Sequence, residues 1–149
     1  MKKILLIILI LVLNNCSGYQ PIFSNNQFDY YISEITNINN DDISNQIIRN
    51  LSPYKIDNGK QKIALELKSK LDEKVVSRDT KGDPLVYEIK IEVEMNVINN
   101  EKNKKLKFKE NFNFNNQSNK FELSQYKNNL IENLIEKIFE KILLNLQTI

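Results

Sequence analysis

The segment from Tyr87 to Val97 alternates strictly between apolar and polar side chains, and this pattern restricts the fold more than any other part of the chain. Its apolar positions are Tyr87, Ile89, Ile91, Val93, Met95 and Val97, and the positions between them are Glu88, Lys90, Glu92, Glu94 and Asn96. A period of two places alternate side chains on opposite faces of a β-strand. The pattern therefore predicts a strand that buries one face and exposes the other to water.

The segments on either side of this strand have the same period. Before it, the alternating apolar residues are Ile63, Leu65, Leu67 and Leu71, and after it they are Leu106, Phe108, Phe112 and Phe114. Turn residues at 80–84 and 99–103 separate the three segments, so we expect an antiparallel meander. The phenylalanines are expected in the core, with a lipid pocket as the alternative. Glu110 interrupts their row, which indicates a bulge or an edge position.

Charge predicts the register of this meander. In one register Met95 lies between Leu67 and Leu106. The exposed Glu92 and Glu94 then lie opposite lysines on both neighbouring strands, Lys70 and Lys68 on one and Lys109 and Lys107 on the other. Opposite charges across strands contribute ~0.2–1 kcal/mol per pair, and aligned like charges destabilise the sheet. Charge and hydrophobicity therefore select the same register.

Two amphipathic helices and one further strand are expected around the meander. A strand at 28–35 precedes a helix that Asn39 to Asp42 begin and Ser52-Pro53 end. A long helix begins near Ser124 and reaches Leu146, with an apolar stripe of Leu130, Leu134, Ile138 and Ile142. The order β-α-β-β-β-α predicts an α+β fold, in which two helices pack on one face of a four-stranded, mostly antiparallel sheet.

The N-terminus has the pattern of an export signal followed by a lipid-attachment cysteine. Two lysines precede an apolar run from Ile4 to Leu13, and Cys16, the only cysteine, follows it. Ten helical residues rise ~15 Å, about half of a ~30 Å hydrocarbon core, which is too short for a transmembrane anchor. We therefore expect a signal peptide at 1–15, a linker lipidated at Cys16 over 16–27, and a single domain at 28–149. A plain cleaved signal with a free cysteine is the alternative.

Composition argues against the common catalytic chemistries. The chain has no histidine and one cysteine, which excludes zinc sites and His-dependent relays of the usual kinds. Without Lys2 and Lys3, 19 of the 21 basic residues remain against 19 acidic ones, so net charge does not favour a nucleic-acid partner. Glu92 and Glu94 could form a glycosidase-like pair, but on an open face beside lysines. We expect neither enzymatic activity nor a cofactor or metal.

Several short motifs stand in a characteristic order along the chain. They are Cys16 followed by Gly18-Tyr19-Gln20-Pro21-Ile22-Phe23, then Ile47-Ile48-Arg49-Asn50-Leu51, then Asp83-Pro84-Leu85-Val86-Tyr87. With the final amphipathic helix, this order resembles the LPS-assembly lipoprotein LptE family, particularly its alphaproteobacterial branch.

The resemblance implies a periplasm-facing lipoprotein of the outer membrane, anchored through acyl chains such as palmitate on Cys16. Such a protein plugs the LptD barrel, assists its assembly and helps deliver lipopolysaccharide to the outer leaflet. The alternative is an envelope lipoprotein that acts as a pilotin or barrel-assembly accessory, with a protein client and no lipopolysaccharide binding. Lipopolysaccharide carries phosphates, so the expected contacts are three lysines near a hairpin tip without obvious partners, Lys102, Lys104 and Lys105.

Overall fold

The computed structural model describes residues 30–57, 61–99 and 103–148, so the expected signal peptide, linker and Cys16 lie outside the described residues. The elements in chain order are β1 (Tyr30–Asn37), α2 (Asp42–Leu51), the short 3-10 helix η2 (Ser52–Tyr54), β2 (Gln61–Arg78), β3 (Pro84–Asn99), β4 (Asn103–Asn115) and α3 (Lys120–Leu146). This order confirms the expected α+β fold. None of the helices in the described ranges is long and apolar enough to cross a bilayer.

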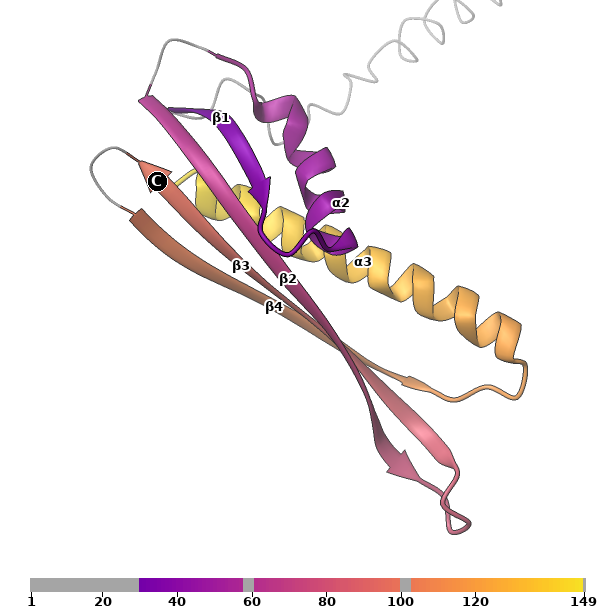
Figure 1. Ribbon diagram of the computed structural model, residues 1–149. Coiled ribbons are helices and arrows are strands. Elements are labelled where there is room, and N and C mark those ends of the chain that lie inside the picture. The colour runs from indigo at the N-terminus through magenta and orange to yellow at the C-terminus, as the bar shows by residue number, and fades with distance from the viewer. Residues whose placement is uncertain (1–29, 58–60, 100–102, 149) are drawn as a thin grey trace, which may run out of the picture.

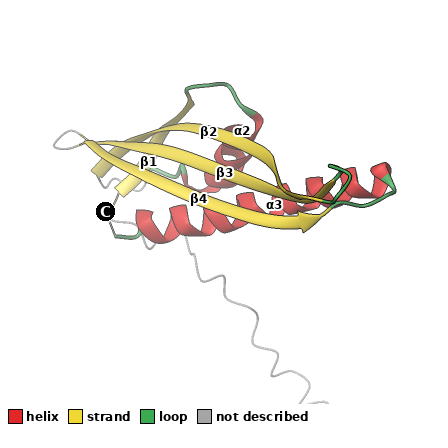
Figure 2. Cartoon of the chain, turned by 90° about the horizontal axis from the view of Figure 1, so that it is seen from below, coloured by secondary structure: helices red, strands yellow, loops and turns green. Residues whose placement is uncertain are grey.

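The four strands form one mixed sheet in the order β1-β2-β3-β4 (Figure 1). β2, β3 and β4 are antiparallel neighbours, whereas β1 runs parallel to β2. A parallel pair needs a crossover connection, and α2 lies in the chain between these two strands. Both helices lie on the same face of the sheet (Figure 2), as expected.

The expected register is confirmed at each position that defined it. Met95 lies between Leu67 and Leu106, and Glu94 lies between Lys68 and Lys107. The five apolar side chains at alternate positions from Ile89 to Val97 are at most 1 % exposed. β3 therefore buries one complete face.

The apolar stripe of α3 completes the core beneath the sheet. Leu130, Leu134, Ile138 and Ile142 are all buried. Four residues rotate an α-helix by about 400°, so a repeat of four advances about 40° around the helix at each step. This advance lets the stripe stay in contact with the twisted sheet that the helix packs against.

The start of α3 differs from the expected one. The helix begins at Lys120 and not near Ser124, because Asn119 caps it. The Asn119 side chain accepts hydrogen bonds from the backbone N–H groups of Phe121 at 3.1 Å and Glu122 at 3.4 Å. The apolar stripe begins later than the helix, so the stripe alone placed the start too far along the chain.

Glu110 lies on an edge strand and not at a bulge. The pairing of β4 with β3 runs without a register shift, and Glu110 lies opposite Ile91. Its carboxylate pairs with Lys141 of α3. An ion pair with the helix therefore accommodates the one acidic residue in the apolar row.

The carboxylate of Asp41 joins α2 to β2. It accepts hydrogen bonds from the backbone N–H of Ser44 at 2.7 Å, which caps α2, and from that of Ser69 at 3.2 Å. The Ser69 hydroxyl also donates to it. Burial alone would raise the pKa of Asp41, but the hydrogen bonds from Ser69 and Ser44 outweigh burial and lower it. One side chain therefore fixes both the start of the helix and its position on the sheet.

We predict that Asp41→Ala lowers the free energy of unfolding by about 1–2 kcal/mol, because it removes a helix cap and leaves the nearly buried Ser69 without its acceptor. Urea unfolding measures the change. Asp42→Ala, one residue along in the exposed first turn of α2, is the matched control and should change stability far less. Equal losses in the two variants would contradict the assigned role of Asp41.

Candidate functional site

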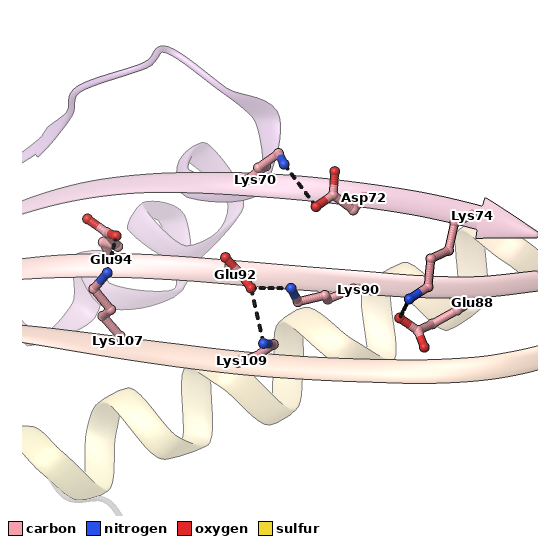
Figure 3. A network of polar contacts seen from close by, with 9 residues as sticks. All are labelled: Lys70, Asp72, Lys74, Glu88, Lys90, Glu92, Glu94, Lys107 and Lys109. Carbon is pink, nitrogen blue, oxygen red and sulfur yellow. Dashed lines mark hydrogen bonds and ion pairs between the residues drawn. The ribbon is translucent and has the colours of Figure 1, made fainter. Parts of the chain in front are cut away.

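The sheet face turned away from the helices carries a dense set of charges, which we call the charged face. It comprises Lys62, Glu66, Lys68, Lys70, Asp72 and Lys74 of β2, Glu88, Lys90, Glu92 and Glu94 of β3, and Lys105, Lys107 and Lys109 of β4. Figure 3 shows most of these side chains spread over the three strands. The period of two places them there, because every alternate residue is held in the core below.

Glu94 is the centre of the charged face. Its carboxylate pairs with three lysines, Lys107 at 2.7 Å, Lys68 at 3.0 Å and Lys105 at 3.3 Å. The Glu94 side chain is 24 % exposed, whereas those of the lysines are 43 to 68 % exposed. Hydrogen bonds from Lys107, Lys68 and Lys105 lower the pKa of Glu94 to about 2. Three cations around one anion leave a local excess of positive charge.

The second acid of β3, Glu92, differs from the expectation in one partner. It pairs with Lys109 at 3.3 Å, as expected, and also with Lys90 of its own strand. Lys70 instead pairs with Asp72 at 2.9 Å, two residues along the same strand. The predicted Lys70–Glu92 ion pair is therefore wrong although the register is right, because alternate residues of one strand share a face and compete for partners.

The three lysines expected to contact lipopolysaccharide do not form one cluster. Lys105 lies opposite Asn96, on the charged face, and pairs with Glu94, so the expectation that it has no partner is wrong. Lys104 lies opposite Val97, which places it on the helix side of the sheet. It is exposed, and no ion pair joins it to another described residue. Lys102 lies outside the described residues.

The grouping of Lys68, Lys105 and Lys107 around Glu94 was not anticipated as a site. The sequence contained a signal for it, because Lys105 is two residues from Lys107 and is therefore a diagonal cross-strand neighbour of Glu94, within reach of a long side chain. The expected register paired Glu94 only with the lysines directly opposite it, so it did not predict the contact with Lys105.

The three phenylalanines of β4 have different surroundings. Phe108 and Phe114 are 6 % and 4 % exposed and belong to the core, and the Phe114 ring stacks on Tyr87 with centroids 5.5 Å apart. Phe112 is 41 % exposed. It lines a hollow of about 450 Å³ beside α3, together with Leu130, Leu134 and the polar Asn133, Glu136, Lys137 and Glu140. Core packing is thus confirmed for Phe108 and Phe114 only.

The fold is shared with solved lipoprotein structures. The crystal structure of the rare lipoprotein B from Shewanella oneidensis superposes with a TM-score of 0.64 at 14 % identity, covering 79 % of this chain and 94 % of that one. The solution structure of an uncharacterized lipoprotein B from Nitrosomonas europaea gives a TM-score of 0.54 at 12 % identity, covering 85 % and 88 %. The sequence matches no protein-family model and no curated protein. At these identities the likeness shows a common fold.

We predict that Glu94→Gln destabilises the protein at neutral pH and that its difference from wild type disappears in acid. The folded-state pKa is about 2, below the ordinary 4.5, so the stabilisation is complete above the ordinary pKa and is lost as the pH falls towards 2. Thermal unfolding from pH 7 to pH 2 measures the difference, which should reach a few degrees at pH 7 and shrink in high salt.

The matched control is Glu132→Gln, at an exposed position of α3 where no described lysine forms an ion pair with the carboxylate. Its unfolding temperature should follow that of the wild type over the whole pH range. A Glu94→Gln difference that stayed constant down to pH 2 would contradict the assigned role of the lysines.

Proposed function

We propose that the chain is a lipid-anchored protein of the outer membrane that plugs and assists assembly of an LptD-like barrel and helps deliver lipopolysaccharide to the outer leaflet. One observation carries the proposal: the described sheet and helices superpose on nearly the whole of a solved lipoprotein. The apolar run that ends just before Cys16 supports it independently. The anchor would face the domain toward the periplasm.

The described domain is suited to a role in binding. Its meander is long, since the 16 residues of β3 extend about 50 Å, and one face is held rigid by a continuous core. The opposite face offers lysines to an anionic ligand. Lys105, Lys107 and Lys68 converge on one carboxylate, so a phosphate group would meet several ammonium groups within a small area.

Membrane attachment and the identity of the partner are tested together. We predict that full-length chain with a C-terminal tag incorporates labelled palmitate, sediments with the outer membrane, and recovers an LptD-like barrel from solubilised envelopes. Cys16→Ser is the control for the anchor and should abolish the label. Recovery of a secretin or a different barrel would instead support a pilotin or assembly accessory, and an intact, unacylated leader by mass spectrometry would exclude the anchor.

Lipopolysaccharide binding is tested through the candidate lysines. We predict that the combined replacement of Lys102, Lys104 and Lys105 by alanine weakens binding of the purified chain to lipopolysaccharide about tenfold, the effect of losing one charge-assisted contact. Because Lys104 and Lys105 lie on opposite faces, the two single variants identify the face that binds. Lys137→Ala on α3, also exposed, is the matched control. Unchanged binding in the triple variant would remove these lysines from the proposal.

A further inference from the structure

The edge of the sheet at β2 is covered over only part of its length. β1 pairs with β2 from Gln61 to Leu67, and the backbone N–H of Ile38 donates to the carbonyl of Leu67 at 2.8 Å. β2 continues to Arg78. Figure 1 shows the remaining part of β2, paired with β3, projecting beyond the end of β1. One long side of this projection has no strand beside it among the described residues.

The direction of the backbone groups along this edge follows from two hydrogen bonds. The carbonyl of Leu67 and the N–H of Ser69 both point away from β3, since Ile38 and Asp41 bind them there. In an antiparallel strand the N–H and C=O of one residue point to the same side, and the side alternates along the chain. The pairing with β3 keeps its register as far as Val75. The backbone groups of Leu71, Glu73 and Val75 therefore face the open edge.

These three residues form an edge with open backbone groups. Within the described part of the chain, no backbone or side-chain group forms a hydrogen bond with their outward N–H and C=O groups. Leu71 is 43 % exposed although it lies on the core side, and its backbone is open as well. The opposite edge, β4, is protected in the ordinary way, by a row of lysines and the inward Glu110. The β2 edge carries charges of the same kinds, with Lys70, Asp72 and Lys74 on the charged face and Glu73 on the helix side, where it pairs with Lys127 of α3. Leu71 and Val75 on either side of Glu73 remain apolar.

We propose that this edge, residues 71–75, accepts an extended segment of a partner protein as an additional strand of the sheet. Backbone groups of Leu71, Glu73 and Val75 would supply the hydrogen bonds of such an addition. The side chains define the chemistry of the segment. It is apolar where it meets Leu71 and Val75, which flank Glu73, whose carboxylate is paired with Lys127. It is acidic where it meets Lys70 and Lys74, whose side chains are 69 % and 66 % exposed on the charged face although each has one acidic partner, Asp72 and Glu88.

A second copy of the chain fits this edge poorly. Antiparallel self-pairing centred on Glu73 would bring Asp72 and Lys74 of the two copies together, which charge favours. The same pairing places residue 77 of the second copy opposite Ser69, where Asp41 is already bound. The turn at 79–83 of the second copy would then meet residues 38–41. A segment that ends or bends away after a few residues avoids this overlap.

The experiment measures amide hydrogen exchange in the full chain by NMR. In the protein alone, the amides of Leu71, Glu73 and Val75 should exchange faster than those of Asp72 and Lys74, which bond to β3. A short synthetic peptide that alternates valine and glutamate is then added to saturation. It should slow exchange about tenfold at the three outward amides. The inward amides should change little.

Variants and control peptides make the result specific. Leu71→Lys places a charge on the edge and should abolish the protection, whereas Leu144→Lys, the same change at a 53 % exposed site on α3, should retain it. A peptide with lysine in place of glutamate, or with a central proline, should not protect.

Four results would overturn the proposal. They are uniform exchange across residues 71–75 in the free protein, no protection by the acidic peptide, equal protection by the lysine peptide, and protection that appears with protein concentration alone. The last would assign the edge to a second copy.

Discussion

The structure depends on the two-sided character of β3. This strand has neighbours on both sides along its length, and its alternate residues from Ile89 to Val97 are removed from water. Complete burial of an aliphatic side chain of this size contributes about 1.5–3 kcal/mol, so a register shifted by one residue, which would turn these side chains to water, is strongly disfavoured. The acids between them are then held on the opposite face. Both the core and the charged face follow from this one constraint.

Contacts between residues directly opposite each other in the sheet could be predicted from the sequence. Met95 could lie between Leu67 and Leu106 only if Glu94 lay between Lys68 and Lys107, and the structure has this arrangement. Hydrophobic burial and charge pairing agree there, which is why a single sequence sufficed. The same reasoning identified the acid that interrupts the row on β4, although it did not choose between a bulge and an edge.

Features that depend on non-local or competing contacts could not be predicted. The parallel position of β1 requires knowing which sheet edge remains free after the meander forms. The salt bridge of Lys70 depended on a choice between two nearby acids, and the pairing of Lys105 on a diagonal neighbour. The exposure of Phe112 depends on how closely its edge strand packs against α3, beside which it lines an open hollow. In each case the alternating pattern was correct, but it did not decide which neighbour the side chain would contact.

The stripe of α3 has a consequence for how this helix could be reused. From Leu130 to Ile142 three steps of four residues rotate the apolar side by about 120°, a third of a turn. In a straight helical bundle, one end of the stripe would point into the bundle and the other into solvent. The helix is therefore suited to packing on a twisted surface. The spacing of its apolar residues reflects the twist of the sheet as well as the period of an α-helix.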